Sequence, residues 1–272
     1  MKNRLPIWFK QDIPDATTRG RMQLLSEFNV HTVCREAKCP NLSFCFKNLK
    51  FTFMILGNTC TRNCKFCGVK KTGTVLKTIE NRPQHRDSSA SDREPSLYID
   101  SDEPYRISQI VKILNLKFVV ITSVTRDDLA DGGAAQFVKT IESIHRIDKN
   151  IKIELLIPDF SGNIANLKAV IDAQPSILAH NIETVRRLCK ILRPKADYQT
   201  SLDILSQIKQ INPVLITKSS LILGLGETEE EIIYTMEDLR ASQCDILTLG
   251  QYLAPSKNHY PVKEFITIEQ FR

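Results

Sequence analysis

The sequence lacks the features that would place the protein in or beyond a membrane. No apolar run approaches the roughly 20 residues that a membrane-spanning helix needs. The first 21 residues are polar and include Asp12 and Asp15, so they do not form a secretory signal. We therefore expect no membrane partner.

Aromatic residues are also few, at 7% of the chain, and no recognition module accompanies the net charge of +6, so we expect no nucleic-acid partner. Between Cys60 and Lys71 there are four basic residues and no acidic one: Arg62, Lys65, Lys70 and Lys71. One interpretation is that they form a solvated basic surface. The other is that they contact an acidic protein or an anionic cofactor.

The rest of the composition is that of a globular protein. Hydrophobic residues make up 42% and charged residues 25% of the 272 positions. A chain of this length buries a substantial core, as one domain or as a domain with appendages.

Cysteine is unevenly placed, because six of the eight cysteines lie between residues 34 and 67. They form two triplets, a C-x4-C-x5-C group followed by a C-x3-C-x2-C group; the members are Cys34, Cys39 and Cys45, then Cys60, Cys64 and Cys67. Thiolates clustered in this way are typical ligands of a soft metal. A thiol-rich window also indicates a reducing compartment, most simply the cytoplasm.

The number of thiolates in each triplet favours iron–sulfur chemistry. A four-iron four-sulfur (4Fe-4S) cluster held by three cysteines keeps one iron open to an outside ligand, as a cluster that touches a substrate requires. The alternative is a zinc–cysteine knot, and spacing alone leaves it open. Disulfides are favoured less than either, because nothing else in the chain looks extracellular.

Apolar runs and amphipathic stretches alternate along the chain. We predict strands at 51–56, 118–122, 152–157, 176–179, 215–223 and 245–249, and helices at 17–28, 104–115, 133–147, 164–173, 183–192, 198–211 and 228–242. Strands alternating with helices predict an α/β fold with a parallel sheet, closed as a partial six-stranded (β/α) barrel with an N-terminal cysteine-rich extension. The predicted boundaries are residues 1–50 for the extension and 51–272 for the barrel, with an exposed inserted loop at 80–102.

Polar or glycine-containing segments follow each predicted strand. Turn chemistry alone explains any one of them, but six such segments at one rim behind a cysteine loop favour a binding site. His180 stands in an apolar setting, and we predict a packed, hydrogen-bonded core histidine rather than a ligand.

The cysteine loop resembles that of the radical S-adenosylmethionine (SAM) enzymes, in the residues Cys-Thr-Arg-Asn-Cys-Lys-Phe-Cys at 60–67. The upstream triplet, in CREAKCPNLSFC, resembles the second cluster motif of one branch, the lipoyl synthases. Further phrases of that family recur at 121–134 (ITSVTRDDLADGGA), 154–160 (ELLIPDF), 179–185 (AHNIETV), 223–228 (LGLGET) and 247–256 (LTLGQYLAPS). The resemblance spans nearly the whole chain.

The resemblance implies two 4Fe-4S clusters. The second triplet would hold the cluster whose open iron binds SAM, and the first would hold an auxiliary cluster consumed as the sulfur donor. A radical from SAM would abstract hydrogen from carbons six and eight of a protein-bound octanoyl group, giving the lipoyl cofactor. Strand-end position and the resemblance together place five residues at SAM: Phe66 beside the adenine, and Ser123, Asp127, Asn181 and Glu183. Radical chemistry needs no general acid or base, so we name none.

The implied partners are an octanoylated carrier domain and an electron donor such as flavodoxin or ferredoxin. The carrier would be the E2 component of a 2-oxoacid dehydrogenase or the glycine cleavage H protein, and such carriers are often acidic.

One family feature is missing. The auxiliary cluster's fourth ligand in the family is a serine of an Arg-Ser-Ser-Tyr motif, and the sequence contains no such motif. Two alternatives follow: a catalytically impaired, metal-stabilised scaffold or fragment, or another sulfur-inserting radical SAM enzyme.

Overall fold

The computed structural model describes residues 6, 9, 13–72 and 99–272. Most of the predicted inserted loop at 80–102 therefore lies outside the described residues. One seven-stranded sheet dominates the described part, in the order β1-β2-β5-β6-β7-β8-β9. Its six parallel strands are β2 (Thr52–Ile55), β5 (Phe118–Ser123), β6 (Lys152–Leu156), β7 (Ile177–Ala179), β8 (Ile216–Leu223) and β9 (Ile246–Gln251).

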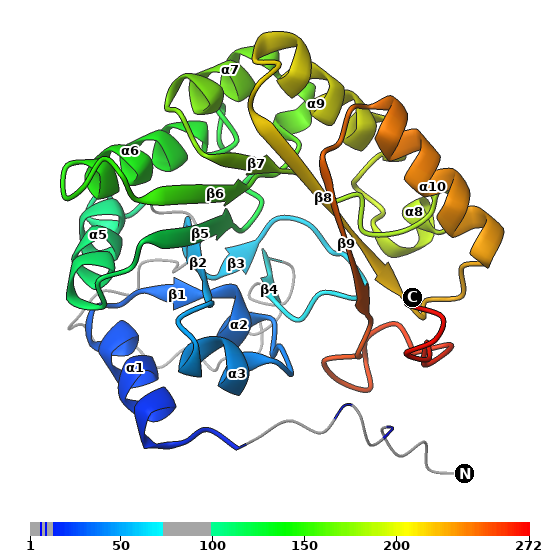
Figure 1. Cartoon of the computed structure of the whole chain (residues 1–272), viewed down its shortest axis with the longest axis horizontal. Helices are drawn as coiled ribbons and strands as arrows, with labels where there is room; N and C mark the ends of the chain where they lie inside the picture. The colour runs from blue at the N-terminus through cyan, green and yellow to red at the C-terminus, as the bar shows by residue number, and fades with distance from the viewer. Residues whose placement is uncertain (1–5, 7–8, 10–12, 73–98) are drawn as a thin grey trace, which may run out of the picture.

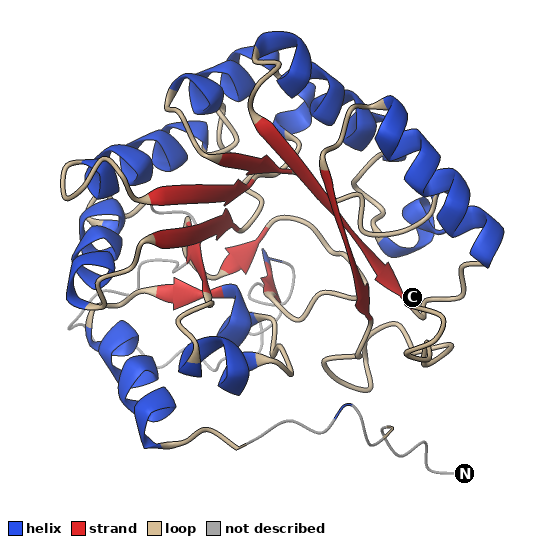
Figure 2. Ribbon diagram, viewed as in Figure 1, coloured by secondary structure: helices blue, strands red, loops and turns tan. Residues whose placement is uncertain are grey.

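The helices lie along the outer side of this curved sheet (Figure 1). They are α5 (Glu103–Ile113), α6 (Ala134–His145), α7 (Ile164–Asp172), α8 (Arg186–Leu192), α9 (Tyr198–Ile211) and α10 (Glu229–Ala241). Figure 2 shows strands inside and helices outside, as in a barrel that stops short of closure. Among the described strands, β9 pairs with β8 alone and leaves the barrel open on its other side. The predicted partial six-stranded barrel is confirmed.

Burial of apolar side chains explains why these segments form strands of one sheet. Phe53 of β2, Ile121 of β5, Leu155 of β6 and Leu178 of β7 are all fully buried. Side chains of this kind gain roughly 1.5–3 kcal/mol each on leaving water, so the apolar runs of the sequence become neighbouring strands of one core.

The cysteine-rich extension folds against the first strand. It contains α1 (Ala16–Glu27), β1 (His31–Thr32), α2 (Val33–Glu36) and α3 (Leu42–Lys47). The helix predicted at 17–28 overlaps α1, but β1, which pairs antiparallel with β2 through His31–Met54 and Thr32–Phe53, was not predicted. The division at residue 50 stays a prediction.

One predicted helix was wrong at its start. The helix expected from Glu183 begins instead at Arg186. Glu183 has a positive φ of 67°, which a helix does not allow, and it forms a single parallel bridge with Leu221 of β8. Residues 180–185 therefore form a rim loop after β7.

Candidate metal and cofactor site at the carboxyl ends of the strands

The cysteine loop leaves β2 through a sharp turn, because Leu56 and Gly57 have φ values of 67° and 81°. Glu103, at the start of α5, accepts hydrogen bonds there from the Leu56 amide at 2.9 Å and from the Gly57 amide at 3.4 Å. A short parallel pair, β3 (Thr59–Cys60) and β4 (Lys70–Lys71), then closes the loop on itself. The Glu103 side chain thus holds the start of the loop, and backbone pairing of β3 with β4 closes it.

The three thiols of this loop lie close enough to influence one another. Burial, aided by the neighbouring Cys64 and Cys60, raises the pKa of Cys67 to about 11. Burial also raises the pKa of Cys64, against the opposing charge of Arg193. Since a metal takes the thiolate form, binding here must displace protons, and the soft donor set suits iron or zinc.

The donor set bears on the kind of metal group. The loop supplies three free cysteines, Cys60, Cys64 and Cys67, within eight residues. A 4Fe-4S cluster held by three cysteines keeps one iron open, whereas a structural zinc site takes four protein ligands. The three thiols of this loop therefore fit the cluster.

A hollow opens beside these cysteines, inside the rim of the barrel. We call it the cysteine hollow. Four of the five residues predicted at SAM line it together with the thiols: Phe66, Ser123, Asn181 and Glu183. The Ser123 hydroxyl is buried and has no hydrogen-bond partner within the described part of the chain. A buried polar atom of this kind fits a bound group that would complete it.

Glu183 stands opposite the cysteines. The Asn181 amide donates to its carboxylate at 3.1 Å. Burial raises the pKa of Glu183, and Arg193 opposes that change. A carboxylate in such surroundings suits a positively charged partner, such as the amino group or sulfonium of SAM.

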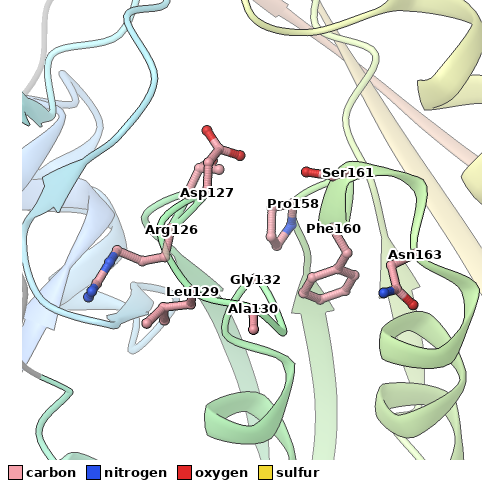
Figure 3. Close-up of a pocket in the computed structure, with 10 residues that line it drawn as sticks. Arg126, Asp127, Leu129, Ala130, Gly132, Pro158, Phe160, Ser161 and Asn163 are labelled. Carbon is pink, nitrogen blue, oxygen red and sulfur yellow. The ribbon is translucent and has the colours of Figure 1, made fainter.

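Asp127, the fifth predicted residue, does not line the cysteine hollow. Its carboxylate accepts a hydrogen bond from the Thr61 hydroxyl at 2.9 Å and pairs with Arg62 at 2.9 Å. It lines a neighbouring 170 Å³ hollow between the loops that follow β5 and β6. In Figure 3 it stands at the rim of that space, and Phe160 lies across the gap. Its contact with SAM stays a prediction.

Arg62 fastens the cysteine loop to the barrel rim. Its guanidinium pairs with Asp127 and with Asp159, including a 2.6 Å hydrogen bond from Nη2 to Asp159 Oδ1. Burial alone would raise the pKa of Asp159, but Arg62 outweighs it and leaves that pKa below its usual value. A solvated basic surface was one of the two alternatives that the sequence left open for Arg62, and its side chain is only 10% exposed. Nothing local in the sequence identifies partners 65 and 97 positions away.

A C-terminal loop covers the other side of the cysteine loop. His259 Nε2 donates to the Cys67 carbonyl at 3.2 Å, and the Ser256 hydroxyl lies 2.8 Å from His259 Nδ1. The Tyr260 amide donates to the Lys65 carbonyl at 3.0 Å. The sequence analysis did not identify His259 or Tyr260, and it contains Ser256 only as the last residue of the phrase at 247–256.

The first triplet lies in the extension around α2 and α3. Burial raises the pKa of Cys34 to about 11, and the nearby Cys39 and Cys45 add to the rise, so these three thiols also share one neighbourhood. The two triplets approach each other through the backbone, because a Cβ atom added at Gly68 would lie 2.7 Å from the Ala37 carbonyl oxygen.

His180 is the buried core histidine that the sequence predicts. It is 3% exposed, and its Nδ1 lies 3.0 Å from the Ile157 carbonyl oxygen. Its Nε2 lies 3.2 Å from the Ser201 hydroxyl.

No helix among the described residues is long and apolar enough to cross a membrane.

Comparison with known proteins places these features in a family. Residues 54–239 match the model of the Radical SAM superfamily. The lipoyl synthase of Caldanaerobacter subterraneus subsp. tengcongensis is 43% identical over 272 residues, covering 100% of this chain and 88% of that protein. The lipoyl synthase of Geobacter sulfurreducens is 47% identical over 269 residues, covering 99% of this chain and 81% of that protein.

Solved structures agree on the fold. Methylornithine synthase superposes with a TM-score of 0.54 at 15% identity, covering 79% of this chain and 56% of that one. Coproporphyrinogen III oxidase from Escherichia coli, a radical SAM enzyme, gives 0.54 at 14% identity, covering 80% and 48%. At these identities the likeness extends to the fold alone.

Proposed function

The chain belongs to the lipoyl synthase family of radical SAM enzymes, and from this premise we propose that it inserts sulfur at carbons six and eight of a protein-bound octanoyl group. The observation that carries the proposal is the pair of cysteine triplets, one lining the hollow at the barrel rim and the other packed beside it. Family membership alone would indicate the type of reaction, but it would not identify the residues that perform it.

The second triplet, Cys60, Cys64 and Cys67, would hold a 4Fe-4S cluster with one iron open to SAM. When bound, this cluster supplies the electron that cleaves SAM to methionine and a 5′-deoxyadenosyl radical. The buried Ser123 hydroxyl and the Glu183 carboxylate would orient SAM in the cysteine hollow.

The remaining residues of the hollow position SAM and exclude water. Phe66 gives the adenine an apolar neighbour, and Asn181 holds the Glu183 carboxylate in place. Arg62 fastens the loop that carries the cysteines, with Asp127 acting through it. Carbon–hydrogen bonds of an alkyl chain resist acids and bases, so we assign no general acid or base.

The first triplet, Cys34, Cys39 and Cys45, would hold the auxiliary cluster that supplies the sulfur atoms. The octanoyl group would arrive on a lysine of a small carrier domain, from a 2-oxoacid dehydrogenase E2 or the glycine cleavage H protein. Thiol-rich sites of this kind require a reducing compartment, so we propose the cytoplasm.

The test is anaerobic reconstitution followed by assay with an octanoylated carrier domain, SAM and dithionite. We expect two 4Fe-4S clusters per chain by iron and sulfide analysis, and a carrier whose mass rises by two sulfur atoms, as the dithiol that persists under dithionite. Zinc without sulfide in the purified protein would overturn the proposal.

Two variants separate the roles of the triplets. Cys64→Ala should abolish SAM cleavage. Cys34→Ala should retain SAM cleavage and form no lipoyl product. SAM cleavage by the wild type without any sulfur insertion would instead identify a catalytically impaired relative.

A further inference from the structure

A second hollow, of 550 Å³, lies on the outer side of the cysteine loop. Three lysines line one part of it, Lys65, Lys70 and Lys71, and the C-terminal loop lines the other with Ser256, His259 and Tyr260. We call it the lysine hollow. No acidic side chain of the described residues 13–72 and 99–272 lines it.

The three lysines have no acidic partner among the residues that the structure describes. None of them takes part in the ion pairs found within the described part of the chain. Arg62, the fourth basic residue of this stretch, is different, because Asp127 and Asp159 neutralise it at the barrel rim. The positive charge of the loop therefore faces outward, toward whatever occupies the lysine hollow.

The lysine hollow is separated from the cysteine hollow by the loop that carries the cysteines. The two hollows share only Val69 among their lining residues. Lys65 stands between Cys64 and Cys67 in the chain, and the His259 ring donates to the Cys67 carbonyl at 3.2 Å. A protein bound in the lysine hollow would thus lie one layer of chain away from the thiols and would leave the cysteine hollow open.

The proposed reaction needs electrons from outside the chain. Each reductive cleavage of SAM oxidises a donor by one electron and breaks one carbon–sulfur bond, giving methionine and a 5′-deoxyadenosyl radical. Electron transfer slows steeply with distance, so the donor must dock close to the cysteines. It must also leave the cysteine hollow free for SAM and for the octanoyl arm of the carrier.

We propose, resting on the function proposed above, that the lysine hollow is the docking surface of an acidic one-electron donor protein. Lys65, Lys70 and Lys71 supply the complementary charge, and the thin layer of chain between them and the thiols supplies the short path. The carrier domain is a poorer fit to this surface, because its octanoyl arm must enter from the opposite side of the cysteine loop. Charges at the edge of such a contact mainly govern the rate and the salt dependence of association.

The experiment uses reconstituted holoprotein and reduced flavodoxin as the probe. The variant Lys70→Glu/Lys71→Glu reverses two charges of the lysine hollow. The matched control, Lys149→Glu/Lys152→Glu, reverses two exposed lysines at the amino end of β6, the other end of the barrel. Flavodoxin affinity is measured by calorimetric titration at low and at high salt, and SAM cleavage is measured with flavodoxin and separately with dithionite.

We expect the Lys70→Glu/Lys71→Glu variant to bind flavodoxin about tenfold more weakly at low salt, with the difference shrinking at high salt. Its SAM cleavage should fall with flavodoxin and stay at the wild-type rate with dithionite. The control variant should match the wild type in all assays.

Three outcomes overturn the proposal. They are wild-type flavodoxin affinity in the Lys70→Glu/Lys71→Glu variant, an equal loss in the control variant, or weaker binding of the carrier domain with flavodoxin binding unchanged. Failure of the proposed function is a separate result, because it appears as no SAM cleavage by the wild type with dithionite, whereas docking is judged by the titration.

Discussion

Glu103 controls the start of the cysteine loop at the scale of a single residue. It is 4% exposed, and besides the Leu56 and Gly57 amides its carboxylate accepts a hydrogen bond from the Gln136 side chain at 3.0 Å. Burial raises its pKa, and these hydrogen bonds oppose the rise. A buried carboxylate with three donors holds the backbone where β2 turns toward the cysteines.

We predict that Glu103→Gln destabilises the fold and loosens the cysteine loop. The glutamine amide would turn a donor toward a backbone N–H or toward Gln136, leaving a buried donor unpaired at a cost of about 1–3 kcal/mol. The unfolding midpoint and the iron retained during gel filtration should both fall. The control is Glu142→Gln on the exposed face of α6, and an equally small effect in both variants would contradict the role of Glu103.

His180 should make the stability of the protein depend on pH. Burial, aided by Arg193, lowers its pKa to about 4 from 6.5. The folded ring therefore stays neutral while the unfolded ring takes a proton, and the unfolding free energy falls as the pH drops from about 6.5 toward about 4. The full loss is roughly 3 kcal/mol.

The test compares denaturant unfolding of the wild type and of His180→Asn between pH 7.5 and pH 5. An asparagine amide can still donate to the Ile157 carbonyl but does not titrate in this range. The wild type should lose more stability than the variant as the pH falls. Parallel pH profiles would rule out His180 as the cause.

The candidate metal-binding cysteines could be predicted from the sequence, because their spacing is a local pattern. The spacing of the two triplets predicted thiols that the structure groups within each triplet. The partners of Arg62 and Glu103 were not predictable, because hydrogen bonds across 33 to 97 positions depend on how strands and loops meet in space.

At the scale of elements, the C-terminal loop at 252–260 holds the cysteine loop in place. The Cys67 carbonyl can only accept, so His259 Nε2 carries the proton and Nδ1 accepts from Ser256. The Tyr252 hydroxyl donates to the Tyr260 carbonyl at 2.8 Å and stiffens the same loop. The two loops are therefore coupled through defined hydrogen bonds.

We predict that His259→Phe weakens retention of the cluster on the second triplet. Phenylalanine keeps a ring but leaves the Cys67 carbonyl without its donor, which should free the last cysteine of the loop. The electron paramagnetic resonance signal of the reduced, SAM-bound cluster should weaken or broaden. Ser256→Ala keeps the imidazole and should give a smaller change. A larger effect from Ser256→Ala would contradict the prediction that the hydrogen bond from His259 to the Cys67 carbonyl is the more important of the two contacts.

Strands were more predictable than the segments that join them. Each predicted strand overlaps an observed one, and the core strands β2 and β5 come from short apolar runs, as buried parallel strands do. Only the start of the helix predicted at 183–192 was wrong, because Glu183 takes a backbone conformation that local propensity does not reveal. The β3–β4 pair was missed because two-residue strands leave no periodic pattern.

At the scale of the whole molecule, three distant parts of the chain meet at one glycine. A Cβ atom at Gly68 would lie 2.7 Å from the Ala37 carbonyl oxygen, in the extension, and 3.1 Å from Pro255 Cβ, in the C-terminal loop. Gly68 itself follows the last cysteine of the second triplet. The relative placement of the two triplets thus depends on a close backbone approach.

We predict that Gly68→Ala separates these three segments and impairs both triplets together. A contact of 2.7 Å with backbone cannot be relieved by rotating a side chain, so the extension or the C-terminal loop must move. The iron and sulfide content should fall at both sites, the unfolding temperature should drop, and sulfur insertion should decline more than SAM cleavage because it needs both triplets in register. The matched control is Gly20→Ala in α1, where a Cβ atom would meet nothing within 4 Å and an alanine should stabilise the helix by about 0.5–1 kcal/mol. A Gly68→Ala protein with full cluster content and an unchanged ratio of the two activities would show that the triplets are positioned independently of this junction.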